Sequence, residues 1–321
     1  MKRAKYMKRV MVALLMGLVV AVALSGCGRL VPEPVETLSV YATFYPIYAL
    51  TDAVMAGIPD AELHCLVQPQ DGCLRAYQLS DWDVSLLSAG ADAVIAGGRG
   101  LESFESALFG WGDEGPAISA VLYNLELYQG REGEGDSETE SHLAGPNPHL
   151  YMSIPGAGQI VESVSAMLMS LDPRYADTYV TNAEAAEERL DEMYAMTREE
   201  LSRYKGSPVV LMNEALVYIA RDYGLEVAEW IERESGESME DRDLEACLER
   251  LEEAGAKVIL IEKQAPQALV EVLQDAGYAV ARLDVMSTHR EGEGFDRYLE
   301  IQSDNARVLR EAFERAETGK D

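Results

Sequence analysis

The chain has 321 residues and a formal net charge of −29 at pH 7, because 56 acidic residues outnumber 27 basic ones. An acidic surface of this size repels polyanions, which argues against nucleic acid as a partner, and it raises the local concentration of cations. The chain is also longer than the roughly 250–300 residues at which a single hydrophobic core stops growing, so its folded body is predicted to have two lobes.

Residues 1–26 have the features of a secretory signal peptide. Five positive charges lie within the first nine residues, and an uncharged apolar run that is short for a membrane span follows from Val10 to Leu24. The run ends in Leu24-Ser25-Gly26-Cys27, which resembles the lipobox of bacterial lipoproteins. This resemblance implies cleavage before Cys27 and a diacylglyceryl group on its thiol. The alternative is a single membrane anchor with a chance cysteine.

Lipidation of Cys27 predicts an extracytoplasmic protein held at the cell membrane, since each buried methylene contributes about 0.8 kcal/mol and at least two chains are attached. Residues 27–37 contain Pro32 and Pro34 among small and acidic residues, so we interpret this segment as a tether. Cleavage of the signal peptide removes five positive charges and takes the formal charge from −29 to −34.

The other three cysteines are predicted to lie in the folded body. Cys247 falls in an amphipathic helical pattern and is expected in the core. Cys65 and Cys73 bracket a short loop. Outside the cytoplasm this pair is able to form a disulfide, whereas a reducing habitat would keep both thiols free, and the sequence leaves both alternatives open.

From residue 38 onward, short β-rich runs alternate with longer helical patterns, which is typical of an α/β fold with a largely parallel sheet. The N-terminal lobe is predicted over residues 38–171. Its expected strands and helices are strands at 38–41, 62–67, 91–96 and 125–128, and helices at 46–56, from about 80–81, and at 101–108. Residues 130–145 are rich in Gly, Glu, Ser and Thr, which predicts an acidic surface loop with His142 exposed to solvent.

A helical pattern without an internal proline or glycine runs from residue 173 to residue 204. At about 1.5 Å per residue such a helix would be about 45 Å long, so we interpret residues 172–205 as a helix that links the lobes. The C-terminal lobe is predicted over residues 206–321. Its expected elements are strands at 209–212, 258–262 and 279–284, and helices at 215–223, 241–253, 266–275 and 304–316.

The sequence contains no pattern that predicts catalysis. The glycines at 97, 98 and 100 fit neither a dinucleotide-binding fingerprint nor a phosphate-binding loop with its lysine, so we interpret them as turn residues. Neither Gly-x-Ser-x-Gly nor His-Glu-x-x-His occurs. These observations predict a binding protein rather than an enzyme.

Four segments, in order along the chain, resemble one protein family. They are Thr43-Phe44-Tyr45-Pro46-Ile47-Tyr48, Gly98-Arg99-Gly100-Leu101-Glu102, Asn147-Pro148-His149-Leu150-Tyr151, and residues 215–225, which end in Ala-Arg-Asp-Tyr-Gly-Leu. With the lipobox and the long helix, they make the chain resemble the lipid-anchored solute-binding proteins of ABC importers for zinc or manganese. The resemblance implies two α/β lobes joined by one long helix, a monomer, an ABC permease as partner, and zinc or manganese as the transported ligand.

The resemblance places the metal between the lobes, on one residue from each of four loops at strand ends, where open α/β sheets generally bind ligands. His149 stands where the family has its second histidine, and Asp284 where it has the closing carboxylate. The third ligand aligns with Asn213, and Glu214 is adjacent. Imidazole and carboxylate groups are the donors that a divalent ion requires at about 2.0–2.2 Å.

At the first ligand position the chain departs from the family. Arg75 aligns there, and a guanidinium stays protonated and cannot bind a metal, while Cys73 lies two residues earlier. Three interpretations stay open. Cys73 or Glu214 completes a metal site with His149 and Asp284; or Arg75 binds an anionic ligand or a metal chelate; or Arg75 pairs with Asp284 in a receptor whose role has changed.

Two further residues are expected near the cleft. Tyr45 is placed there by the family resemblance. Glu262 ends a strand of the second lobe, so it either faces the cleft or has a structural role. A surface adhesin on the same fold is an alternative function, for which no residue pattern argues.

Overall fold

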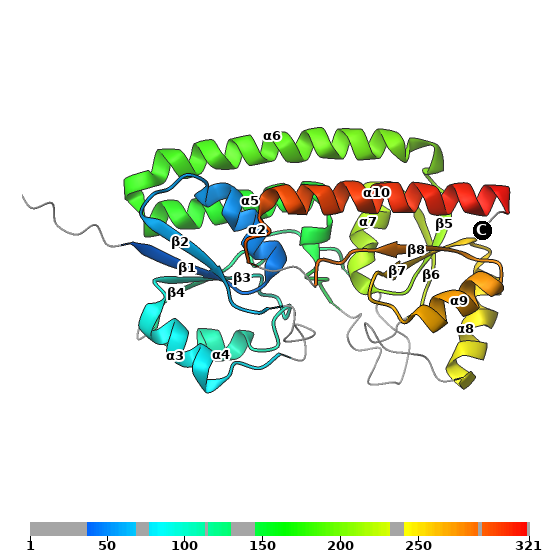
Figure 1. Cartoon of the computed structure of the whole chain (residues 1–321), viewed down its shortest axis with the longest axis horizontal. Coiled ribbons are helices and arrows are strands. Elements are labelled where there is room, and N and C mark those ends of the chain that lie inside the picture. Colours follow the sequence, from blue (N-terminus) through cyan, green and yellow to red (C-terminus); the bar gives the residue numbers. More distant parts are fainter. Residues whose placement is uncertain are drawn as a thin grey trace, which may run out of the picture. The chain divides into compact units, whose positions relative to one another are not determined.

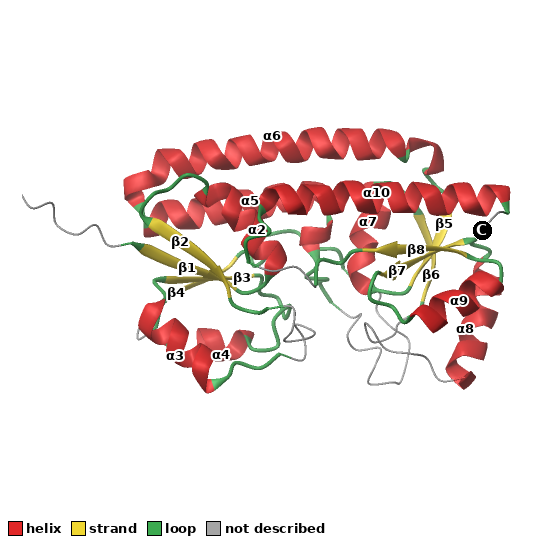
Figure 2. Ribbon diagram, in the orientation of Figure 1, coloured by secondary structure: helices red, strands yellow, loops and turns green. Residues whose placement is uncertain are grey.

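In the described part of the chain, the computed structural model contains two four-stranded sheets in which every strand pairing is parallel (Figures 1 and 2). The structure describes residues 37–68, 77–112, 115–129, 145–231, 241–287 and 291–319, without the side chains of 241–243. The first sheet has the order β2-β1-β3-β4 and the second β6-β5-β7-β8. The strands are β1 Leu38–Ala42, β2 Ala61–Cys65, β3 Ala93–Ala96, β4 Ala117–Ala120, β5 Pro208–Leu211, β6 Glu226–Trp230, β7 Val258–Glu262 and β8 Ala279–Leu283. This confirms the predicted two-lobed α/β fold.

The helices of the first lobe flank its sheet. They are α2 Tyr45–Met55, α3 Asp81–Gly90, α4 Glu105–Phe109, the 3₁₀ turn η4 Leu150–Met152 and α5 Ile154–Leu171. The predicted start of α3 is confirmed by a reciprocal cap, in which the Ser80 hydroxyl accepts from the Asp83 N–H and the Asp83 carboxylate accepts from the Ser80 N–H.

Three sequence predictions in this lobe were wrong. The fourth strand is β4 at 117–120, not 125–128, because only the earlier segment pairs with β3. Helix α4 begins at Glu105 rather than at residue 101, since residues 99–104 form turns. Helix α5 was missed because Pro155, Gly156 and Gly158 lie within its first five residues, where they resemble loop residues. Ser153 caps this helix by accepting from the Gly156 N–H.

The predicted linking helix is confirmed as α6, Ala176–Glu200, between the 3₁₀ turns η5 Pro173–Tyr175 and η6 Ser202–Tyr204. Its 25 residues span about 38 Å. Helix α6 contacts α5 from the first lobe and α10 from the second, so it packs on both parts of the fold (Figure 1).

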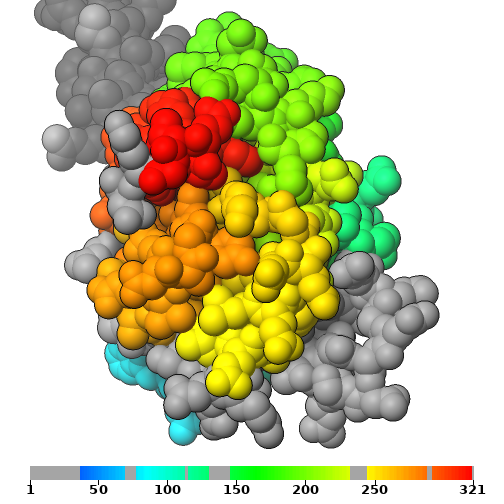
Figure 3. All heavy atoms as spheres, turned by 90° about the vertical axis from the view of Figure 1, so that its right-hand side faces the viewer, coloured from blue at the N-terminus to red at the C-terminus, as the bar shows by residue number. Residues whose placement is uncertain are grey.

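The second lobe contains η7 Glu214–Leu216, α7 Val217–Asp222, α8 Asp241–Ala254, α9 Gln267–Asp275 and α10 Phe295–Thr318. Figure 3 shows α8 and α9 beside the end of α10 on one face. Two predictions here were wrong. Strand β6 was missed because the run Glu-Val-Ala-Glu-Trp mixes charged and apolar residues without a clear period. Helix α10 begins at Phe295 rather than at residue 304, because its first turns use buried Tyr298 and Leu299 as core residues.

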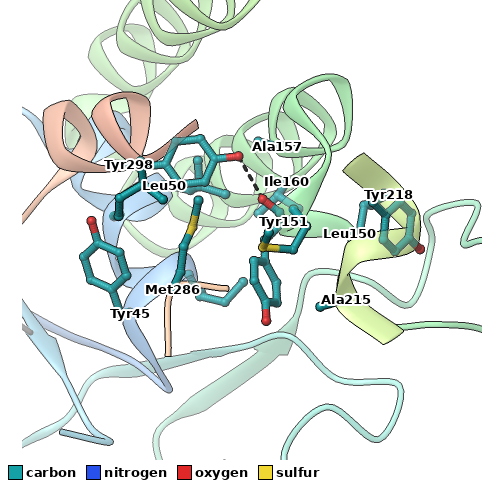
Figure 4. Close-up of a cluster of buried hydrophobic side chains, with 14 of the residues drawn as sticks. Tyr45, Leu50, Leu150, Tyr151, Ala157, Ile160, Ala215, Tyr218, Met286 and Tyr298 are labelled. Carbon is teal, nitrogen blue, oxygen red and sulfur yellow. Dashed lines mark hydrogen bonds between the residues drawn. The ribbon is translucent and has the colours of Figure 1, made fainter. Parts of the chain in front are cut away.

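The lobes share buried contacts close to the chain segment that contains His149. The Tyr298 hydroxyl of α10 donates to the Tyr151 carbonyl at 2.8 Å (Figure 4). The Gln302 amide donates to the Tyr298 hydroxyl at 2.9 Å. Tyr298 and Gln302 are at most 1% exposed. These contacts fix the backbone of η4 against α10.

The glycine turn after β3 is organised by one buried carboxylate. Glu102, 2% exposed, accepts from the Gly97 N–H at 2.7 Å, from the Gly98 N–H at 2.9 Å and from the Thr43 hydroxyl at 2.6 Å. Gly98 has φ +80°, and a Cβ there would lie 2.6 Å from that of Ala120. The glycines are therefore turn residues, as predicted, and two of the four family-like segments meet at Glu102.

The described cysteines are buried. Cys247 is 2% exposed in the core of the second lobe, as predicted. Cys65 is a free thiol whose S–H donates to the Val67 carbonyl, and burial raises its pKa to about 12, so it is a poor nucleophile. Cys27 and Cys73 lie outside the described residues, as do the predicted signal peptide and all of the predicted tether except Thr37. None of the described helices has the length and apolar character needed to cross a bilayer.

Asp222 joins the lobes by capping a helix of the other lobe. It ends α7, and its carboxylate accepts from the Ser153 hydroxyl and the Ile154 N–H, both at 3.0 Å, at the start of α5. Burial raises the Asp222 pKa from 3.8 to about 6, while these hydrogen bonds and the Arg221 charge oppose the shift. The folded protein therefore binds a proton here more readily than the unfolded chain does.

This shift predicts a pH dependence of stability. Because the folded pKa is raised, the contribution of Asp222 is present below the unfolded pKa of 3.8 and is lost as pH rises through about 6. The loss is about 3 kcal/mol over this window. Urea unfolding measures the free energy of unfolding at pH 4 and pH 7. Between these pH values the wild type should lose about 3 kcal/mol relative to Asp222→Asn, whose residue 222 cannot titrate. A constant difference between the two proteins across the window would contradict the assignment.

Candidate metal centre

His149 is oriented by the amide of Asn147. The Asn147 NH₂ donates to the Glu214 carbonyl at 2.9 Å, so its oxygen accepts from the His149 backbone N–H at 3.0 Å. The same oxygen lies 2.9 Å from His149 Nδ1. Because an amide oxygen only accepts, Nδ1 carries the proton and Nε2 carries the lone pair that a metal requires. Asn147 itself is 6% exposed.

The lone-pair nitrogen of His149 faces a carboxylate from the second lobe. His149 Nε2 lies 3.8 Å from Glu214 Oε1, and the two side chains are 12% and 16% exposed. This separation is too long for a hydrogen bond. Two donors that each lie about 2.1 Å from one ion can be at most about 4.2 Å apart, so 3.8 Å is compatible with a shared ion.

Asp284 follows β8 and is held by α10. Its backbone N–H donates to the Asn305 amide oxygen at 2.8 Å, and its carbonyl accepts from the Asn305 NH₂ at 2.9 Å. One carboxylate oxygen accepts from the Met286 N–H at 2.8 Å, and the other lies 3.4 Å from Lys263 Nζ. The carboxylate is therefore fixed in orientation and has a cation beside it.

Tyr45, the first residue of α2, brings the first lobe close to Asp284. It is 2% exposed. Burial raises its pKa most, and the charges of Glu293 and Asp284 raise it further. In the view of Figure 4, Met286 lies between Tyr45 and Tyr151. The segment after β8 thus lies against residues of the first lobe.

The other predicted site residues have the following places. The Asn213 amide oxygen accepts from the Ala215 N–H at 3.0 Å and so caps η7. Glu262 is fully buried at the end of β7, in register with Leu283 of β8. Cys73 and Arg75 lie outside the described residues. The ligand roles of these residues stay predictions.

The described residues therefore bring together two of the predicted metal donors, His149 and Glu214. Among them, no three His, Cys, Asp or Glu side chains lie close enough together to hold an ion. The structure brings His149 and Glu214 together and leaves Asp284 outside any such group of three. Asn147 belongs to one of the family-like segments, but its contact with Glu214 could not be predicted from the sequence. Asn305 and Lys263 were not identified from the sequence, because their contacts with Asp284 join distant segments.

The comparisons with known proteins decide the family. Residues 40–312 match the model of the family described as ZnuA, zinc-uptake complex component A, periplasmic. The chain belongs to this family. The ZnuA description names an uptake component and no catalytic activity.

Individual relatives of the chain are distant in sequence. The zinc-binding lipoprotein AdcA of Streptococcus pneumoniae is 27% identical over 287 residues, which cover 85% of the chain and 55% of AdcA. The manganese-binding lipoprotein MntA of Bacillus subtilis is 24% identical over 64% of the chain and 66% of MntA. The chain thus spans only about half the length of AdcA.

A solved structure of one part of AdcA matches the fold. The zinc-bound ZnuA-like domain of S. pneumoniae AdcA has a TM-score of 0.70 at 22% identity, with 86% of the chain and 98% of that domain covered. The match covers both lobes, so the part of AdcA that corresponds to this chain is its ZnuA-like domain.

Proposed function

We propose that the protein is the extracytoplasmic receptor of an ABC importer and binds one zinc or manganese ion between its lobes. The observation that supports this most directly is the placement of His149 Nε2 at 3.8 Å from the Glu214 carboxylate. Asn147 holds both residues, since it orients the His149 ring and donates to the Glu214 backbone. A buried imidazole with its other nitrogen fixed by an amide is typical of metal-binding histidines.

In this proposal His149 and Glu214 bind the ion together, and Asp284, which forms no group of three with them among the described residues, is the predicted third ligand. They supply one neutral imidazole and two carboxylates, a donor set that suits zinc and is acceptable to manganese. Cys73 and Asn213 stay candidates for a fourth donor, and Arg75, Tyr45 and Glu262 stay predicted contacts. The strong negative charge of the chain raises the concentration of divalent cations around the protein.

The test is a calorimetric titration of protein that has been treated with a chelator and then exchanged into metal-free buffer. Zinc or manganese should bind at one ion per chain and raise the melting temperature, because at a free concentration of 100 times Kd the ion adds about 2.7 kcal/mol of stability. If neither zinc nor manganese binds at one ion per chain, the proposal is wrong.

We further propose that the receptor is lipidated on Cys27 and delivers its ion to a membrane permease. The lipobox-like Leu24-Ser25-Gly26-Cys27 supports the anchor, and AdcA and MntA are both lipoproteins by name. In a bacterial host, Cys27→Ala should move the protein from the membrane fraction to the soluble fraction and abolish labelling by a fatty acid. Equal labelling of the wild type and Cys27→Ala would contradict lipidation at this residue.

A further inference from the structure

Among the described residues, Lys263 places an ammonium in contact with the proposed ligand Asp284. Its Nζ lies 3.4 Å from Asp284 Oδ2, and the two side chains are 60% and 8% exposed. The contact therefore joins a buried carboxylate to an ammonium that reaches it from the solvent side.

The backbone of Lys263 is firmly held, although its side chain is exposed. Its N–H donates to the Leu283 carbonyl at 2.7 Å, and its carbonyl accepts from the Arg282 guanidinium at 2.6 Å. These bonds keep the base of the side chain next to the end of β8, directly before Asp284. The four-carbon stem then lets the ammonium approach the carboxylate or withdraw into water.

The nearby arginine has a different partner. Arg297 of α10 pairs with Glu300 at 2.9 Å, and this hydrogen bond is the largest cause of its raised pKa, to which Asp284 adds at longer range. Arg297 thus forms its ion pair within α10, whereas Lys263 contacts an oxygen of the Asp284 carboxylate.

We propose that Lys263 is a built-in competitor of the metal ion at Asp284. This inference rests on the proposed function. In the metal-free protein the ammonium neutralises the buried carboxylate, and a divalent ion that binds Asp284 must displace it, because the two cations repel each other at one oxygen. Lys263 thereby weakens binding and speeds release, which suits a receptor that must pass its ion onward.

In the alternative role, the ion pair with Lys263 only holds the Asp284 carboxylate in position. The two roles predict opposite effects on affinity. If Lys263 competes, its removal tightens binding, whereas if it positions the carboxylate, its removal weakens binding or leaves it unchanged.

The experiment measures the Kd and the dissociation rate of zinc by competition with a chromophoric chelator, in the wild type and Lys263→Gln at low salt. Lys263→Gln should bind zinc about 5- to 10-fold more tightly, mainly through slower release, because one partly exposed charge is removed. The difference should shrink in 0.5 M salt, since exposed charges are screened. Lys263→Arg keeps the charge and should stay within about twofold of the wild type.

Lys257→Gln is the control for net charge. Lys263 follows strand β7, and Lys257 precedes the same strand at its other end. The Lys257 ammonium lies 5.4 Å from the centre of the Tyr278 ring. This variant loses the same charge away from Asp284 and should change the Kd by less than about twofold. If zinc binding is unchanged or weaker in Lys263→Gln, the competitor role is wrong while the proposed function stands. If the wild type binds neither zinc nor manganese, the proposed function itself fails.

Discussion

Replacing His149 with Ala is expected to weaken zinc binding by at least about 100-fold. Loss of a residue that merely orients a ligand costs about 10- to 100-fold in affinity, and here a ligand itself is removed. At a zinc concentration that raises the melting temperature of the wild type by several degrees, the variant should show no shift. The metal-free variant should unfold close to the wild type, because the Asn147 amide keeps its bond to the backbone N–H at position 149.

His64→Ala is the matched control. His64 lies in β2, 32% of its side chain is exposed, and its Nδ1 is 3.1 Å from Glu291. Like His149, it is a histidine of the first lobe, but its ring contacts Glu291 and not Glu214. Its replacement should leave the zinc-induced shift intact. Glu214→Gln should resemble His149→Ala, since a neutral amide is a weak ligand for zinc. Equal zinc affinity in His149→Ala and His64→Ala would show that the ion binds elsewhere.

Glu102→Ala is expected to lower the free energy of unfolding by about 3–5 kcal/mol. The carboxylate accepts three hydrogen bonds in a buried turn, so its loss leaves the N–H groups of Gly97 and Gly98 and the Thr43 hydroxyl without this acceptor. Burial is the largest influence on Glu102 and raises its pKa, which these hydrogen bonds oppose. The segment that leads from β1 into α2, and hence to Tyr45, depends on the same contact.

Glu105→Ala gives the comparison for this prediction. Glu105 accepts from the Gly100 N–H at 2.7 Å in the same turn, but it does so at an exposed position. Its replacement should lower the free energy of unfolding by no more than about 1 kcal/mol. Urea unfolding of the two variants measures the difference. Similar destabilisation by Glu102→Ala and Glu105→Ala would contradict the role of burial at this turn.

The fold was largely predictable because its strongest signals are local. Buried parallel strands such as β7 are continuous apolar runs, and the long helix α6 has no proline or glycine in its interior. The errors fall where local signals conflict with tertiary contacts. Helix α5 starts with proline and two glycines, and the edge strand β6 mixes charged and apolar residues.

The sequence predicted candidate ligands but not the residues around them. His149 falls in one of the family-like segments, and Asp284 stands where the resemblance places the closing carboxylate. Their neighbours come from other elements: Asn305 of α10 binds the backbone of Asp284 from 21 residues away, and Lys263, which follows β7, contacts the Asp284 carboxylate. No pattern along the chain predicts that the Asn305 amide binds the backbone of Asp284 or that Lys263 contacts its carboxylate.

The most direct test of the metal site is anomalous diffraction at the zinc absorption edge from crystals of the zinc-loaded protein. The proposal predicts one strong peak at about 2.0–2.2 Å from His149 Nε2 and from oxygens of Glu214 and Asp284. A fully occupied ion that has neither His149 nor Glu214 among its ligands would contradict it.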